Sequence, residues 1–146
     1  MTYLISACLL GCACRYDGQS KPISPFVKRL MEKATLIPVC PEILGGLSTP
    51  RPPAEIVGDR VINANGVDVS AAYRKGAEEA LSLARLYNAQ GIILRDKSPS
   101  CGKGRIYDGS FSRTLTDGNG ITAALFREAG IPIYSEGEIE ELLSLL

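Results

Sequence analysis

The chain has 146 residues, 45% of them apolar, and its 16 basic residues balance 16 acidic ones. This length and composition fit a single domain over residues 1–146, and the balanced charge gives no general affinity for nucleic acid or anionic lipid. No apolar run approaches the roughly 20 residues of a membrane span, and the start lacks the regions of a signal peptide, so we expect a cytoplasmic protein without membrane contact.

The chain begins with a predicted strand over residues 3–7. This segment is a short apolar run without alternation, which is typical of a strand covered on both faces. A loop then leads into a helix with Ser24 as its N-cap and Pro25 in its first turn. One face of this helix is predicted to be apolar and to contain Phe26, Val27, Leu30 and Met31. A second apolar strand follows over residues 35–39.

The middle of the chain predicts a hairpin and a long helix. Residues 55–63 contain two short β-type runs that turn at Gly58-Asp59, after a stretch rich in proline and glycine. Apolar residues recur at helical spacing from about Ser70 to Asn88. This helix returns the chain to a third buried strand over residues 91–95.

The last third of the chain is predicted to contain a long loop before the final strand. Residues 96–120 are rich in Ser, Gly and Asp, and a loop of this length is more often functional than idle. A helix over residues 121–129 precedes a fourth strand over residues 131–134, in which Pro132 favours a position at the sheet edge. Ser135 then opens a terminal helix.

This order of elements predicts a three-layer α/β fold. We expect a mainly parallel sheet of about four strands with right-handed crossovers, a flavodoxin-like (Rossmann-like) strand order and a small β-hairpin excursion. Sheets of this type bind their ligands at the carboxyl ends of the strands. The functional site is therefore predicted at that edge.

Three of the five cysteines lie just beyond predicted strands, namely Cys8, Cys40 and Cys101. Because the carboxyl ends of parallel strands meet at one edge of a sheet, we expect these thiols to gather there as a metal-cluster site. An odd number of cysteines argues against a disulfide framework. The complete absence of histidine excludes Ser-His-Asp triads, Cys-His dyads and histidine-ligated zinc.

The other two cysteines, Cys12 and Cys14, follow Cys8 closely. The spacing Cys-x3-Cys-x-Cys matches neither the paired zinc pattern nor the usual ferredoxin runs. Three roles stay open for these two cysteines: further ligands, participants in cluster assembly, or residues with no part in the site. Arg51, which lies between two prolines, either pairs with an anion or carboxylate or is solvated.

Two further motifs have a structural and a functional interpretation. The first is a pair of similar peptides, Arg15-Tyr-Asp-Gly18 and Ile106-Tyr-Asp-Gly109. They are either ordinary tight turns or segments whose tyrosines and aspartates form the walls of a pocket. The run Gly118-Asn-Gly-Ile-Thr-Ala123 imitates a dinucleotide fingerprint, but it follows a loop rather than a strand. A helix N-terminus with free amides is the preferred interpretation.

The motifs around the three cysteines resemble those of the thiouracil desulfidase family of bacteria. They are Ser-Ala-Cys-Leu-Leu-Gly with Arg-Tyr-Asp-Gly, Cys-Pro-Glu with Gly-Gly-Leu, and Ser-Pro-Ser-Cys-Gly with Ile-Tyr-Asp-Gly. The resemblance covers residues 2 to about 136. It implies a [4Fe-4S] cluster held by Cys8, Cys40 and Cys101, with one iron left open for the sulfur of a thiolated base.

The resemblance also implies an activity and the residues that perform it. The activity would be hydrolytic desulfidation of a thiolated pyrimidine such as 4-thiouracil, with Glu42 as general acid and base. Ser98, or alternatively Ser100, would orient water or substrate. The implied partners are a small thiolated base and the proteins of cluster assembly. The alternatives are a cluster-binding accessory or sensor protein without catalysis and a structural zinc site.

Overall fold

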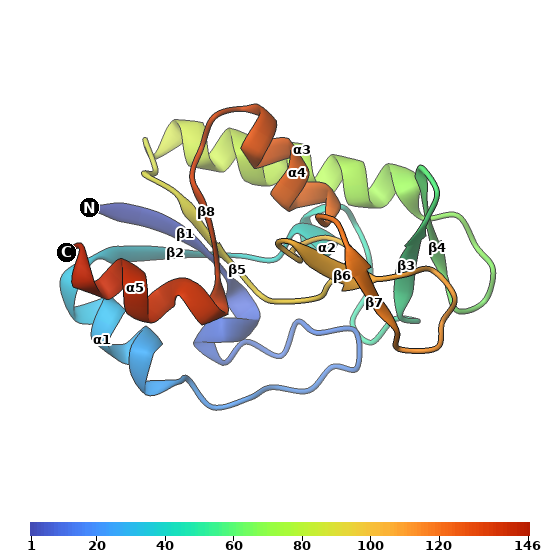
Figure 1. Ribbon diagram of the computed structural model, residues 1–146, viewed down its shortest axis with the longest axis horizontal. Helices are drawn as coiled ribbons and strands as arrows, with labels where there is room; N and C mark the ends of the chain where they lie inside the picture. Colours follow the sequence, from blue (N-terminus) through green and yellow to red (C-terminus); the bar gives the residue numbers. More distant parts are fainter.

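The computed structural model describes residues 1–146 and contains a four-stranded parallel sheet at its centre (Figure 1). Its strands are β1 (Thr2–Ser6), β2 (Thr35–Val39), β5 (Ile92–Leu94) and β8 (Ile133–Ser135). They lie in the order β2-β1-β5-β8, and every neighbouring pair is parallel. This is the order of the first four strands of a flavodoxin-like sheet, so the predicted fold class is confirmed.

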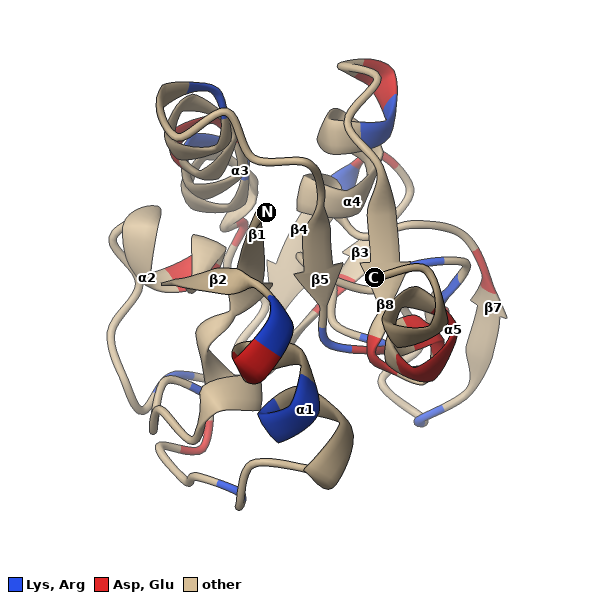
Figure 2. Ribbon diagram, turned by 90° about the vertical axis from the view of Figure 1, so that its left-hand side faces the viewer, with Lys and Arg blue, Asp and Glu red and all other residues tan.

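Helices cover both faces of this sheet. They are α1 (Pro25–Lys33) and α5 (Ile139–Ser144) on one face, and α3 (Ser70–Leu86) and α4 (Ile121–Glu128) on the other. Figure 2 shows α3 and α4 above the sheet and α1 and α5 below it. None of the helices combines the length and the apolar composition that a membrane-spanning helix needs.

The core is divided by the sheet into two apolar layers. Leu4, Ile92 and Leu94 face α3 and α4, where Phe126 fills the centre. Their neighbours along the strands pack on the other side, against α1 and α5, and include Tyr3, Ile5 and Ile93. Both sides of each strand are buried, which explains why these segments have no polar alternation.

Two antiparallel hairpins lie outside the main sheet. The first pairs β3 (Ala54–Val57) with β4 (Arg60–Asn63) across Gly58-Asp59, which confirms the predicted excursion. The second pairs β6 (Arg105–Tyr107) with β7 (Leu115–Asp117). The prediction of one continuous loop over residues 96–120 was therefore wrong. Strands of three residues are too short to show a period of two among the surrounding serines and glycines.

The N-cap of α1 is as predicted, because the Ser24 hydroxyl accepts a hydrogen bond from the Val27 amide at 3.2 Å. The predicted apolar face of this helix is only half correct. Val27 and Leu30 are buried, whereas Phe26 and Met31 are 40% and 50% exposed. The latter two flank the buried stripe on either side, and α1 contacts its neighbours along a narrow line.

The last strand and the start of the terminal helical segment agree with the predictions. β8 is an edge strand, as Pro132 indicated. Ser135 opens the terminal segment with a capping box to Glu138, although a short turn, η2 (Glu136–Glu138), precedes α5. Another short turn, η1 (Ala7–Leu10), directly follows β1.

A short helix that the sequence did not predict, α2 (Pro41–Leu44), follows β2 and packs against α3. Glycines allow this contact: a Cβ at Gly76 would clash with the carbonyl oxygen of Pro41, and one at Gly45 would clash with the carbonyl of Ala72. The two backbones therefore touch directly. This contact brings the residues that follow β2 over the first half of α3.

Candidate metal centre

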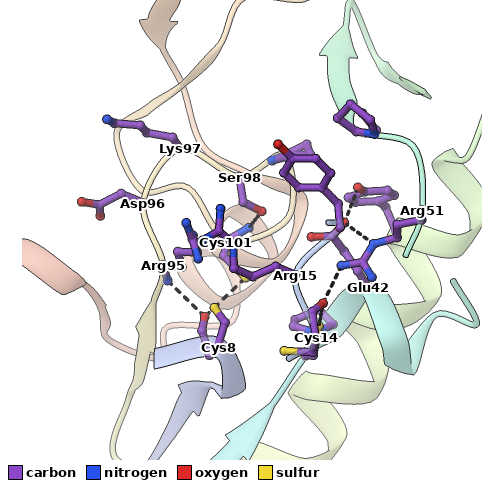
Figure 3. Close-up of a pocket in the computed structure, with 18 of the residues that line it drawn as sticks. Cys8, Cys14, Arg15, Glu42, Arg51, Arg95, Asp96, Lys97, Ser98 and Cys101 are labelled. Carbon is purple, nitrogen blue, oxygen red and sulfur yellow. Dashed lines mark hydrogen bonds and ion pairs between the residues drawn. The ribbon is translucent and has the colours of Figure 1, made fainter. Parts of the chain in front are cut away.

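A pocket of about 450 Å³ lies at the carboxyl ends of the parallel strands. Residues that follow β1, β2 and β5 line it, together with the loop after η1 and the β6–β7 hairpin. Four of the five cysteines line this pocket, namely Cys8, Cys14, Cys40 and Cys101. Cys12 is exposed and does not. Figure 3 shows the labelled side chains arranged around this common space.

Local structure positions each of the three predicted ligands. Cys8 lies in η1 at the end of β1, and Cys40 is the N-cap of α2 at the end of β2. Cys101 lies in a turn in which the Ser98 hydroxyl accepts hydrogen bonds from the amides of Ser100 and Cys101, both at 3.0 Å. Cys101 is only 6% exposed and packs against the core, but it still lines the pocket.

The N-terminus of α4 supports the turn that contains Cys101. The amide of Ile121 donates to the Pro99 carbonyl at 2.8 Å, and that of Thr122 donates to the Ser100 carbonyl at 2.9 Å. The prediction of free amides at this helix end was therefore wrong. The carbonyls of the cysteine turn take the place that an anion would occupy.

The thiols differ in their tendency to ionise. A hydrogen bond from Cys14 lowers the pKa of Cys8 to about 6, with help from Arg95, and the pKa of Cys40 to about 7, with help from the Ile43 amide. The pKa of Cys14 is raised because its thiol is the partner of both. Burial raises the pKa of Cys101 to about 12. Metal ligation by Cys101 therefore requires displacement of its proton by the metal.

The donor set of the pocket fits an iron-sulfur cluster. No three or more cysteine, aspartate or glutamate side chains converge closely enough to hold a single metal ion. Several thiols instead surround one cavity, and thiolates are the ligands of iron-sulfur clusters.

The charged side chains that line the pocket are predominantly basic, although the chain has no net charge. Its cationic side chains are Arg15, Lys21, Arg51, Arg95, Lys97 and Arg113. The acidic residues of the lining are only Glu42, Glu55 and Asp96. A thiolate-bound cluster is anionic, so this excess of positive charge is electrostatically favourable beside it.

Glu42 belongs to a partly buried network of hydrogen bonds. Its Oε1 accepts from the Tyr73 hydroxyl at 2.6 Å and from Arg51 Nε at 3.2 Å. The Arg51 side chain is only 5% exposed, and its Nη2 also donates to the Cys14 carbonyl at 2.9 Å. The interpretation of Arg51 as a partner of a carboxylate is therefore confirmed.

Sequence reasoning missed Tyr73 as a site residue. It occupies an apolar position of α3 and is 2% exposed, so helical spacing alone assigned it to the core. A buried tyrosine hydroxyl usually has a hydrogen-bond partner, and that rule was the available signal. Burial and the neighbouring Glu42 raise the pKa of Tyr73 well above its ordinary value, so this hydroxyl stays protonated and donates.

The two candidate serines occupy different places. Ser98 lines the pocket, and its oxygen caps the turn of Cys101. Ser100 is fully buried, and its hydroxyl lies 2.8 Å from that of Thr122, away from the pocket lining. Only Ser98 is therefore in a position to meet a ligand.

The two Tyr-Asp-Gly motifs combine both interpretations. Tyr16 and Tyr107 line the pocket, whereas Asp17 and Asp108 accept hydrogen bonds from amides two residues later in their own turns. The tyrosines are walls of the pocket, and the aspartates shape the turns. Phe111 also lines the pocket, in a loop held by the buried carboxylate of Glu55.

Comparison with known proteins decides the family. The family model for 2-thiouracil desulfurase matches residues 3–138. The chain belongs to the 2-thiouracil desulfurase family. The uncharacterized protein YbbK of Bacillus subtilis (strain 168) is 42% identical over an alignment of 150 positions, which covers 96% of this chain and 99% of YbbK.

This chain also closely matches a solved structure. The [4Fe-4S]-dependent thiouracil desulfidase TudS superposes with a TM-score of 0.92 at 44% identity, over 99% of both chains. The resemblance predicted from the cysteine motifs is thereby confirmed, together with the three-layer fold.

Proposed function

We propose that this protein uses a [4Fe-4S] cluster to remove sulfur hydrolytically from a thiolated pyrimidine such as 4-thiouracil, with residues 1–146 as a single cluster-binding domain. The observation that best supports this function is the pocket in which cysteine thiols lie beside the Glu42, Tyr73 and Arg51 network. Membership of the 2-thiouracil desulfurase family and the likeness to TudS support the same activity.

The cluster would be held by Cys8, Cys40 and Cys101. Each of these cysteines comes after a strand of the parallel sheet, and each lines the pocket. When bound, a cluster that keeps one iron free of protein ligands supplies a Lewis acid for the sulfur of a thiocarbonyl. Arg15 and Arg95 lie in the same lining and offset negative charge there.

Glu42 would act as the general acid and base. It takes a proton from the attacking water and returns one to the ring nitrogen, and no net electron transfer is needed because the overall reaction converts a thiouracil and water into uracil and sulfide. Tyr73 and Arg51 hold the carboxylate by two hydrogen bonds. Ser98, which also lines the pocket, would orient the water or the base.

The partners follow from the size of the pocket and from the cofactor. A cavity of about 450 Å³ suits a small thiolated base rather than a polymer. A protein with an iron-sulfur cofactor also depends on cluster-assembly proteins. All five cysteines are free thiols, which suits a reducing compartment, so we place the protein in the cytoplasm.

Anaerobic reconstitution followed by incubation with 4-thiouracil tests this function. We expect uracil and sulfide in equal amounts. Glu42→Gln should keep the visible absorption of the cluster and lower turnover by about a hundredfold or more, which is the usual range for general acid-base catalysis. A reconstituted protein that releases no sulfide from any thiolated pyrimidine would instead be a cluster-binding accessory protein.

A further inference from the structure

Cys14 is a fourth thiol in the pocket that three-cysteine ligation does not use. Its side chain hydrogen-bonds with the thiols of both Cys8 and Cys40. Its backbone carbonyl accepts from the Cys40 thiol at 3.8 Å and from Arg51 Nη2 at 2.9 Å. Two of these contacts join Cys14 to Cys40, one through its side chain and one through its backbone carbonyl.

Cys12 provides the contrast, although it is only two residues away. It is exposed and does not line the pocket. Cys101 is buried against the core, where the Ser6 hydroxyl lies 3.5 Å from its sulfur. Among the five thiols, the pair of Cys14 and Cys40 has both a side-chain and a backbone contact.

We propose that Cys14 and Cys40 form a reversible disulfide when the cluster is absent and a peroxide is present. The thiol of one residue is oxidised by hydrogen peroxide to a sulfenic acid with release of water, and the second thiol then displaces another water as the Sγ–Sγ bond forms. Two thiols lose two electrons and two protons, and one peroxide is reduced to two molecules of water.

This disulfide would protect a cluster ligand. Without a neighbouring thiol, a sulfenic acid is oxidised further to the sulfinic and sulfonic acids, which thiol reductants do not reverse. A disulfide is returned to two thiols by exchange with a reductant, after which Cys40 is again available for iron. The inference rests on the proposed function, because it takes Cys40 as a cluster ligand.

Peptide mapping of the cluster-free protein tests the proposal without any activity measurement. The full chain is freed of iron with an anaerobic chelator, treated with one equivalent of hydrogen peroxide, alkylated and digested without reduction. Mass spectrometry should find Cys14 joined to Cys40 and a fall from five alkylatable thiols to three. Dithiothreitol should restore all five.

Two single variants give the matched comparison. Cys14→Ala should lose the cross-link at one equivalent of peroxide. With three equivalents, since each added oxygen consumes one peroxide, it should gain two or three oxygen atoms on Cys40 and then lose most of its iron uptake after reductant. Cys12→Ala should behave as the parent does. Free Cys14 and Cys40 after peroxide, a cross-link of Cys14 to Cys8, or full recovery of Cys14→Ala would each overturn the proposal. A correct cross-link in a protein that does not desulfidate thiouracil would refute the proposed function alone.

Discussion

At the scale of single residues, the environment of Glu42 shows how its carboxylate would be held for the proposed proton transfer. Tyr73 and Arg51 donate to the same oxygen, Oε1. A second oxygen is left free of protein donors in the pocket wall. Tyr73 and Arg51 thus act as positioning residues that fix where the free oxygen of Glu42 points.

Tyr73→Phe removes one of these two donors and keeps the shape of the core. Hydrogen bonds to charged groups contribute about 1.5–3 kcal/mol, so we expect turnover of 4-thiouracil to fall by roughly tenfold to a hundredfold. The absorption of the cluster should not change. Tyr87→Phe, just beyond α3 at a 53% exposed position, is the control. Equal kcat values for the two variants would show that the Tyr73 hydroxyl does not position Glu42.

The thiols of the pocket predict a pH dependence. The pKa of Cys40 is lowered to about 7, first by the hydrogen bond from Cys14. Above that pH Cys40 is mainly thiolate, and it becomes protonated as the pH falls through 7. Cys14→Ala should therefore raise the pKa of Cys40 and slow its alkylation in the cluster-free protein at pH 7 by about tenfold. If Cys40 is alkylated equally fast in Cys14→Ala and in Cys12→Ala across pH 6–9, the hydrogen bond from Cys14 is not the cause of the lowered pKa of Cys40.

Sequence reasoning grouped Cys8, Cys40 and Cys101, because strand ends are marked by the apolar runs before them. It did not associate Tyr73 or Arg95 with the pocket. Helical periodicity records that Tyr73 is on a buried face but not that its hydroxyl meets a carboxylate 31 positions earlier. In the sequence, Arg95 is recognisable only as the last residue of a predicted strand. Its position beside Cys8 is a result of the fold.

At the scale of elements, the contact between α2 and α3 determines where Cys40 and Glu42 lie. This contact depends on glycines, since a side chain at Gly76 would clash with the Pro41 carbonyl. The sequence could not predict it. A helix of four residues spans barely one turn and shows no period, and the same limit concealed η1 and the β6–β7 hairpin.

Gly76→Ala tests this contact. Overpacking at such a site typically costs 1–3 kcal/mol, so we expect the free energy of unfolding in urea to fall by about that amount. Iron uptake should also fall because α2 moves together with Cys40. Gly137→Ala, where a Cβ meets only the Ser135 hydroxyl at 3.7 Å, is the control. If both alanine variants unfold at the parent urea concentration, the close contact is not required.

At the scale of the whole molecule, topology gathers residues that are far apart in the sequence. Parallel pairing of β1 with β2 and of β1 with β5 places three strand ends at one edge, and so brings position 8 near positions 40 and 101. The fold also gathers basic side chains that are scattered along the sequence. A chain with no net charge concentrates six cationic side chains around one pocket, which composition alone did not reveal.

The central claim is that this pocket binds a [4Fe-4S] cluster through Cys8, Cys40 and Cys101. Its most direct test is the iron and acid-labile sulfide content after anaerobic reconstitution of the parent and of the five single Cys→Ala variants. We predict four iron and four sulfide atoms per chain, the content of the cluster named for TudS, in the parent and the Cys12 and Cys14 variants, and loss of both in the other three. A full cluster in the Cys8, Cys40 or Cys101 variant, or none in the parent, would contradict this claim.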